Sequence, residues 1–433
     1  MQNKFNFTIT EFGPINNANL DLNKLNVVGG FNASGKSFSS RLLFCIITAL
    51  SNEGMHIDND AIKNLFQDFI KRHDLNISAV SDNTEDFSKI LNLFDSWDDY
   101  DVSYDFLDDF YIKFNQYLIN QGLMKSDFEN DLNKIRQVID YHEDKFQYVI
   151  SVLRFLLIKE FGADELNKFN GAHVNVSMEK SDCNMEYDMY FDSDSLTINM
   201  DVDNQISCRE FSNVIYIDSM SAMDFQLTGN HIHYHYISLY DFLTREDNNN
   251  IGVYDNIDDL INITKKFNGM LNGTFKFNSL NNIFSFESNG KVYDVKNIAS
   301  GYKQIGVLQK LLNNNQLNGQ SLLILDEPET NLHPKFQVQL AHIIVQMVKK
   351  VDMMVYINSH SPFIIEALEV YSKKEEIEED INFYICESIN EFETQFNISP
   401  IDRDELKTLY DNLSNPFRVI NNVRFENELN DLD

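Results

Sequence analysis

The sequence predicts an α/β protein with a mixed β-sheet core, and three observations lead to this fold class. Residues 25–28 form an apolar run typical of a buried strand, followed by a glycine-containing turn and a helical run at residues 39–50. Residues 321–327 form a second apolar run, which ends in two carboxylates. Residues 171–217 alternate apolar and polar side chains, the period of strands. Such a mixture of strands and helices favours a sheet with helices packed on its faces.

Further strands are expected where short apolar or alternating runs are bounded by turn residues. The turns Gly13-Pro14 and Asn23-Lys24 separate three of them, so the sheet is expected to be built partly from the N-terminus. Asn289-Gly290 is a typical hairpin turn, and a final helix is expected around Leu409-Tyr410-Asp411. The expected strands are residues 5–10, 18–22, 25–28, 173–178, 185–191, 196–202, 213–217, 275–277, 283–286, 291–295, 321–327, 353–357, 382–385 and 393–398.

The block from residue 51 to residue 170 differs from its flanks because it is acidic, aromatic and helical in period. Apolar side chains recur there at helical spacing, at Leu107, Phe110, Tyr111, Phe114, Phe146, Val149, Ile150 and Leu153. We expect a helical insertion at residues 51–170 and a core made of residues 1–50 and 171–433. The acidic residues between Glu85 and Asp109 favour a solvated helix face, with a site for a basic partner as the alternative.

Composition limits the class of protein. The chain has 433 residues, 43% of them apolar, which is enough for a sizeable core and argues against disorder. Its 35 basic and 67 acidic residues give a formal charge of −32, which repels nucleic-acid backbones unless basic residues cluster locally. The four cysteines are scattered without a C-x-x-C pair, and no apolar segment approaches the roughly 20 residues of a membrane span. These features predict a cytoplasmic protein with reduced thiols and no membrane association.

The glycine-containing turn is Gly30-Phe31-Asn32-Ala33-Ser34-Gly35-Lys36-Ser37, which has the G-x-x-x-x-G-K-S spacing of a phosphate-binding P-loop. Glycines allow backbone N–H groups to turn toward a phosphate, and the following helix N-terminus adds partial positive charge. Lys36 would reach the β- and γ-phosphates, and the Ser37 hydroxyl would hold Mg²⁺. The alternative, a chance Lys-Ser after an ordinary turn, is disfavoured because the flanking strand and helix have the required order.

Two carboxylates and a histidine follow two other predicted strands. Asp326 and Glu327 end the 321–327 run, so they are expected at the carboxyl edge of a parallel sheet, where ligands bind. Asp326 would hold Mg²⁺, and Glu327 would orient and polarise an attacking water. His360 follows the strand at 353–357 and is suited to contact a γ-phosphate. The alternatives are a polar strand end and an ordinary loop histidine.

Two weaker patterns are also present. Ser300 and Gly301 lie in a small-residue turn before a helix expected to start near Ile305, which is another possible anion site by the same dipole argument. The three histidines His231, His233 and His235 alternate, so on a strand they would share one face and offer imidazoles to a transition metal. The simpler alternative for the histidines is a polar strand or lid segment.

In this order, GGFNASGKS, IASGYKQI, LLILDEPETNLHP and INSHSP resemble the ABC-type ATPase superfamily, on the branch shared by SMC-like repair ATPases and OLD-type ATPases. The resemblance covers the two ends of the chain, about residues 1–50 and from 290 onward. The long separation between Lys36 and Asp326 is typical of this branch. The hinge-bearing coiled coil of SMC proteins and the Toprim nuclease domain are not found in the sequence.

The resemblance implies a P-loop NTPase of the ABC ATPase-head type that binds and hydrolyses ATP with Mg²⁺. It makes Lys36, Glu327 and His360 catalytic, gives Ser37 and Asp326 to the metal, and matches Thr330, Asn331 and Leu332 to the D-loop. Residues 225–320 would form the lid and signature part. Nucleotide contacts are implied for Gly30, Asn32, Ser34, Gly35, Lys36, Ser37, Phe38, Ser300 and Gly301.

In this family the signature loop of one subunit closes on ATP held by another, so the resemblance implies an ATP-dependent head-to-tail dimer or higher oligomer. The lack of a nuclease domain implies regulation of a partner effector such as a nuclease, as in prokaryotic anti-phage defence. Ala299 stands where a signature serine normally contacts the γ-phosphate, and Gln226 is the candidate for the Q-loop glutamine. Two alternatives stay open: an SMC-like DNA-repair ATPase that contacts DNA directly, and a scaffold that binds nucleotide only for assembly.

Overall fold

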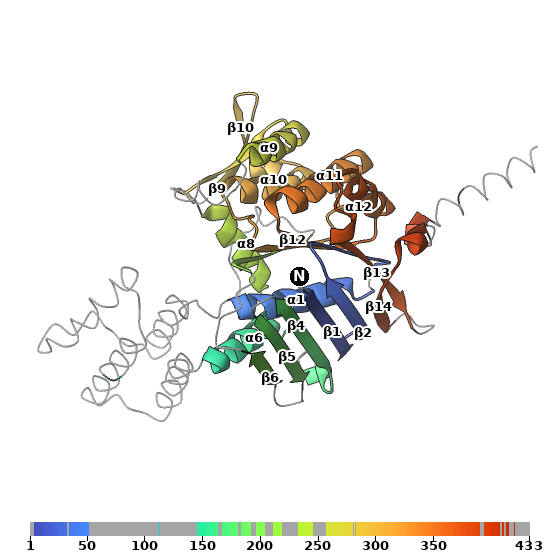
Figure 1. Ribbon diagram of the computed structural model, residues 1–433. Helices are drawn as coiled ribbons and strands as arrows, with labels where there is room; N and C mark the ends of the chain where they lie inside the picture. The colour runs from blue at the N-terminus through green and yellow to red at the C-terminus, as the bar shows by residue number, and fades with distance from the viewer. Residues whose placement is uncertain are drawn as a thin grey trace, which may run out of the picture. The chain divides into compact units, whose positions relative to one another are not determined.

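The computed structural model divides into two compact units, residues 1–51 with 154–433, and residues 52–153. The described residues are 4–32, 34–51, 145–162, 167–180, 183–191, 196–203, 211–218, 233–245, 257–279, 283–389 and 394–407, with positions 112, 281, 409, 410, 413, 414 and 420. Most of the predicted helical insertion at 51–170 therefore lies outside the described residues, and so does the apolar stripe Leu107, Phe110, Tyr111 and Phe114. Ile112, which lies between these residues, is described and is helical. The first unit carries both sheets described below (Figure 1).

The main sheet has eleven strands within the described ranges, in the order β6-β5-β4-β1-β2-β14-β13-β3-β12-β11-β7. The five strands from β13 to β7 run parallel to one another, whereas β1, β2, β4, β5 and β6 pair antiparallel. The mixed α/β class is thus confirmed. The strands are β1 (Lys4–Phe12), β2 (Ile15–Leu22), β3 (Leu25–Gly30), β4 (His173–Lys180), β5 (Cys183–Phe191), β6 (Leu196–Asp203), β7 (Asn213–Ile217), β11 (Ser321–Asp326), β12 (Met354–Ser359), β13 (Ile381–Ser388) and β14 (Phe396–Pro400).

Helices cover both faces of the parallel half of this sheet. The α-helices are α1 (Lys36–Ser51), α6 (Lys145–Phe161), α8 (Tyr234–Thr244), α9 (Ile257–Leu271), α10 (Ser300–Asn313), α11 (Pro334–Val351) and α12 (Pro362–Lys374). Short 3₁₀ turns are η3 (Asn167–Phe169), η5 (Val295–Asn297), η6 (Glu378–Asp380) and η7 (Arg403–Glu405). Figure 1 shows α9 to α12 on the side of β12 that is opposite α1. Strands covered on both faces are largely apolar, and every residue of β3 and β11 is buried.

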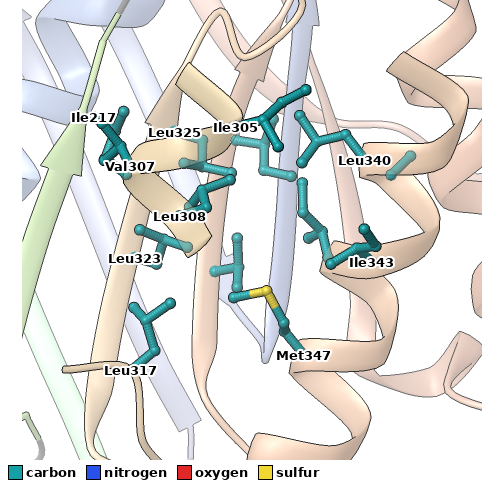
Figure 2. Packing of buried hydrophobic residues seen from close by; sticks show 14 of the residues in the cluster. Ile217, Ile305, Val307, Leu308, Leu317, Leu323, Leu325, Leu340, Ile343 and Met347 are labelled. Carbon is teal, nitrogen blue, oxygen red and sulfur yellow. The ribbon is translucent and has the colours of Figure 1, made fainter. Parts of the chain in front are cut away.

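Alternation along the central strands assigns each side chain to one helical layer. Leu323 and Leu325 of β11 are buried in the cluster that also contains α10 and α11 (Figure 2). On the other face, Tyr216 of β7 packs against Phe44 of α1, with ring centroids 5.7 Å apart. Burying one leucine or isoleucine of this kind contributes about 1.5–3 kcal/mol. The residues of α10 and α11 labelled in Figure 2 are Ile305, Val307, Leu308, Leu340, Ile343 and Met347.

A second sheet has three described strands in the order β10-β9-β8, with β8 (Thr274–Asn278), β9 (Ile283–Ser288) and β10 (Lys291–Asp294). The predicted turn at Asn289-Gly290 joins β9 to β10, and both residues have positive φ, 51° and 73°. A two-residue hairpin turn of this hand needs positive φ at both positions, which asparagine and glycine tolerate. The short-range signal in the sequence was therefore sufficient to place this hairpin.

Several predicted elements differ from the structure in type or in where they begin and end; β2, for example, begins at Ile15 and β13 spans Ile381–Ser388. Helix α10 begins at Ser300 and not near Ile305, because Ala299 is extended and acts as its N-cap. His233 caps α8 and His235 lies in its first turn, so the expected strand is wrong there; His231 lies outside the described ranges. β12 begins one residue later, at Met354, and β14 begins at Phe396. Leu409 and Tyr410 are helical as expected, whereas Asp411 lies outside the described ranges.

No group of three or more His, Cys, Asp or Glu side chains among the described residues is arranged to hold a metal ion, so the alternating histidines provide no such site there. Every helix in these ranges is too short or too polar to span a bilayer.

Candidate functional site

The P-loop lies between the carboxyl end of β3 and the first turn of α1. The Lys36 side chain is 4% exposed and folds back along the loop. Its Nζ donates to the carbonyl oxygens of Gly30 at 2.9 Å and Phe31 at 2.5 Å, and to Ser34 Oγ at 3.1 Å. The ammonium group is therefore held within the turn that the sequence assigned to phosphate binding.

Gly35 is required by the shape of this loop. Its φ is 86°, a left-handed conformation that glycine adopts without strain. A Cβ at this position would lie 2.7 Å from Cδ1 of Ile15 in β2, which is too close for real side chains. The N-terminal strand β2 therefore packs directly against the P-loop turn, and the motif glycine is what allows this close approach.

Lys36 is electrostatically linked to the carboxylates that follow β11. Burial lowers the pKa of Lys36, whereas the charges of Glu327, Asp326 and Glu329 act in the opposite direction. The influence is mutual, because Lys36 is also among the groups that lower the pKa of Glu327. The structure thus brings together residues 36 and 326–329, from distant parts of the sequence.

Strand order explains this proximity. β12 lies between β3 and β11, and all three are parallel. Their carboxyl ends therefore meet at one edge, where the P-loop, the residues after β12 and the carboxylates after β11 lie in a row. This arrangement is the α/β fold of a P-loop NTPase, with an antiparallel half added through β14, β2 and β1.

Asp326 is held by two side chains that the sequence did not single out. Tyr216 in β7 donates its hydroxyl to Oδ2 at 3.0 Å, and Asn358 in β12 donates its amide to Oδ1 at 2.9 Å. Asn358 also donates to Ser40 Oγ in α1 at 2.8 Å. Each Asp326 oxygen accepts one of these bonds, and a carboxylate oxygen has about two lone pairs. The carboxylate is oriented while lone pairs stay available for a cation.

The donor set near Asp326 suits a hard divalent cation. Ser37 lies in the first turn of α1, one turn before Ser40, which contacts both Asn358 and Tyr216. A hydroxyl and a carboxylate are oxygen donors of the kind that Mg²⁺ selects. Asp326 and Ser37 are therefore the residues that fit such an ion.

Glu327 and His360 form a second pair at the same edge. Glu327 has a φ of 52°, and its N–H donates to the Asn358 carbonyl at 2.9 Å. Its Oε1 lies 3.5 Å from His360 Nδ1. The nearby His360 imidazole lowers the pKa of Glu327, and the Glu327 carboxylate raises the pKa of His360. Glu327 is therefore ionised near neutral pH, and His360 holds its proton to a higher pH than a free imidazole does.

A pocket of about 520 Å³ opens beside this pair. Glu327, His360 and the D-loop residues Thr330 and Asn331 contribute to its wall. The remaining lining residues are Glu329, Gln337, Ser361, Pro362, Phe363 and Leu413. The carboxylate and imidazole therefore face a space in which a water or a phosphate oxygen can be accommodated.

The signature residues lie beside the D-loop of the same chain. Ser300 is exposed at the start of α10. A Cβ on Gly301 would lie 2.4 Å from the carbonyl oxygen of Asn331, so only glycine fits this contact. Asn32 is exposed and Phe38 packs on Phe12 and Phe161, which gives Phe38 a structural role. Gln226 lies outside the described residues.

Comparison with known proteins gives structural likenesses only. No family model and no curated protein matches the chain. The SMC head domain from Thermotoga maritima is 8% identical, with 93% of this chain and 100% of that chain covered and a TM-score of 0.41. An SmcHead bound to the C-winged helix domain of ScpA is 8% identical over 93% and 98%, with a TM-score of 0.44.

A third similar structure is an Smc head domain with an extended coiled coil, bound to the C-terminal domain of ScpA derived from Pyrococcus furiosus. It is 8% identical, with 95% of this chain and 100% of that chain covered and a TM-score of 0.43. At this level of identity none of the three transfers an activity to this chain.

Proposed function

We propose that the protein is an ATPase that uses Mg²⁺, with its site at the carboxyl ends of β3, β12 and β11. The observation that carries the proposal is the parallel order of β3, β12 and β11, which places the P-loop with Lys36 and the carboxylates of Asp326 and Glu327 at one edge of the sheet. A P-loop lysine supports phosphate binding alone, whereas a carboxylate and an imidazole facing one pocket beside it support hydrolysis.

In this proposal, each side chain has a role that follows from its environment. Lys36 binds the β- and γ-phosphates. Ser37 and Asp326 would hold Mg²⁺, which supplies neutralisation of phosphate charge. Glu327 is ionised, so it can orient a water for in-line attack on the γ-phosphate and accept its proton. His360, which keeps a proton on its ring near neutral pH, is suited to donate a hydrogen bond to a γ-phosphate oxygen.

We extend the proposal to nucleotide-dependent self-association. Ser300 is exposed and lies beside the D-loop, so this surface is available to close on a nucleotide held by a second copy. Ala299 caps α10 without a side-chain hydrogen bond, so a serine hydroxyl for the γ-phosphate has to come from Ser300 in the first helical turn. Regulation of an effector such as a nuclease, and a role in anti-phage defence, rest on the sequence resemblance alone.

Replacing Lys36 with Ala tests the binding half of the proposal. The change removes a charged donor to the phosphates, worth about 1.5–3 kcal/mol, so ATP affinity should fall about 10–100-fold. Equilibrium dialysis with labelled ATP and Mg²⁺ measures this directly. Lys291→Ala provides a matched control, because Lys291 is exposed on β10. Equal affinity of the Lys36 variant and the unchanged protein would contradict the proposal.

Replacing Tyr216 with Phe tests the Asp326 site. The variant loses the hydroxyl that orients the carboxylate and should need more Mg²⁺ for nucleotide binding, by about 10–100-fold, the usual cost of losing a partner of a metal ligand. Titrating Mg²⁺ at fixed ATP and following bound nucleotide gives the required concentration. Tyr384→Phe in β13 is the control, because that hydroxyl donates to the Asp21 carbonyl instead. An unchanged Mg²⁺ requirement would remove Tyr216 from the site.

A further inference from the structure

Glu329 is a buried carboxylate that has no role in the mechanism above. Its side chain is 3% exposed. One oxygen, Oε1, accepts hydrogen bonds from three consecutive residues at the end of β12 and just after it: Ser359 Oγ at 2.9 Å, His360 N at 2.7 Å and Ser361 N at 3.1 Å. A single acceptor that binds three successive donors fixes the backbone between them. Glu329 thus holds the loop that carries His360.

A second set of hydrogen bonds secures the same loop from the side of α11. Ser361 Oγ donates to Gln337 Oε1 at 2.7 Å, and Gln337 Nε2 donates to the Leu332 carbonyl at 2.9 Å. Ser361 is also the N-cap of α12, and Gln337 lies in the first turn of α11. The His360 loop, the D-loop and the starts of two helices are therefore joined by one buried polar network.

The His360 ring lies between two carboxylates. Its Nδ1 is buried and makes no hydrogen bond of regular geometry, but it lies 3.2 Å from Glu329 Oε1 and 3.5 Å from Glu327 Oε1, within ion-pair distance of both. The ring as a whole is 35% exposed and lines the pocket, so the edge opposite Nδ1 is the one available to a ligand. Two carboxylate oxygens this close to Nδ1 favour the forms of the imidazole, neutral or cationic, in which Nδ1 carries a proton. Lys36 is the charged group that acts on the ring in the opposite sense.

We propose that Glu329 is a positioning residue for hydrolysis: it fixes the His360 loop and keeps a proton on His360 Nδ1, so that the opposite edge of the ring faces the γ-phosphate. The inference rests on the proposed ATPase function. Glu329 acts through His360 and does not touch the nucleotide. Its removal should therefore change the catalytic step and leave ATP binding intact.

Glu329→Gln separates positioning from mere packing, because glutamine keeps the shape and an acceptor oxygen but loses the negative charge. We expect kcat to fall on the order of 10–100-fold, the size of effect that a small misplacement of a catalytic group causes, with KM for ATP unchanged. The alkaline limb of the rate profile should move to lower pH, because the charge of Glu329 raises the pKa of His360. Glu379→Gln, at an exposed glutamate, should leave both quantities unchanged.

A double-mutant cycle tests the route of action. If Glu329 acts through His360, adding Glu329→Gln to His360→Ala should cause no further loss of kcat. If the two substitutions lower kcat additively, the inference is overturned. It is also overturned if the protein hydrolyses ATP and Glu329→Gln changes neither kcat nor its pH dependence.

An NMR titration of His360 without ATP tests the role of Glu329 independently of whether the protein hydrolyses ATP. Histidines labelled with ¹³C at Cε1 can be titrated by NMR, with the His360 signal assigned by its loss in His360→Ala. Glu329→Gln should lower the pH at which His360 titrates, and an unchanged titration would overturn the inference whether or not the protein hydrolyses ATP. Absent hydrolysis with the expected NMR shift would instead count against the ATPase function alone.

Discussion

Glu327→Gln is expected to stop ATP hydrolysis while leaving ATP bound. Glutamine keeps the size of the side chain but cannot accept the proton of the attacking water, and the loss of such a base lowers kcat by about 10²–10⁴-fold. Asp326, Ser37 and Lys36 are unchanged, so the triphosphate should still bind. If ATP closes two copies on each other, the variant should accumulate as an ATP-bound dimer. Single-turnover hydrolysis and light scattering after gel filtration measure the two effects separately.

Glu379→Gln again supplies the matched change, because the side chain is exposed in η6 and distant in sequence from the site. A scaffold that uses nucleotide only for assembly would show no difference between the two variants. Hydrolysis by Glu327→Gln at the unchanged rate would assign the base to another residue. That result would not contradict the proposal that the P-loop binds the nucleotide.

Among the substitutions proposed for this protein, His235→Ala is expected to lower the free energy of unfolding the most. The His235 side chain is fully buried between two carboxylates: Nδ1 lies 2.8 Å from Glu160 Oε2, and Nε2 lies 3.5 Å from Asp218 Oδ2. The His235 N–H also donates to Glu160 Oε1 at 2.9 Å. Without the imidazole, the fully buried Glu160 carboxylate loses its closest cationic partner, and breaking a buried pair costs about 3–5 kcal/mol. Urea unfolding of the full chain measures the difference.

The pH dependence of this difference follows from two pKa shifts. Burial alone would lower the pKa of His235, but the nearby carboxylates of Asp218 and Glu160 raise it overall. The stabilisation from His235 is therefore fully present below pH 6.5 and is lost as pH rises through the raised pKa. The pKa of Glu160 is lowered by His235 despite burial, so its share is present above pH 4.5 and is lost on acidification. The difference between the two proteins should peak between these values.

His173→Ala provides the comparison at a similar ion pair. His173 Nε2 lies 3.1 Å from Asp188 Oδ1, but both side chains are about one-third exposed, 35% and 33%. Exposed pairs are worth about 0–1 kcal/mol, so this variant should unfold near the midpoint of the unchanged protein. Equal midpoints for the His235 and His173 variants would show that the buried cluster contributes no more than a surface pair.

The residues of the candidate site could be named from the sequence because the patterns that single them out are local. A P-loop needs eight consecutive residues between a strand and a helix, and the two acids need only an apolar run before them. The hairpin at Asn289-Gly290 was predictable for the same reason, since positive φ is a property of those residues. The histidine segment was interpreted as a possible strand or lid, because alternation over five residues does not distinguish a strand from a helix start. His235 lies in α8 and contacts the buried Glu160.

The sequence by itself determined which residues can bind phosphate, hold a cation and accept a proton, because those properties belong to side-chain types at short spacing. Only the tertiary structure decided what orients them. Tyr216 and Asp326 are 110 residues apart and meet because β7 pairs with β11. Asn358 reaches Asp326 because β12 is the next strand in register, and Glu329 reaches His360 across the same edge. Strand order and register depend on the packing of the whole sheet, which no short stretch of sequence specifies.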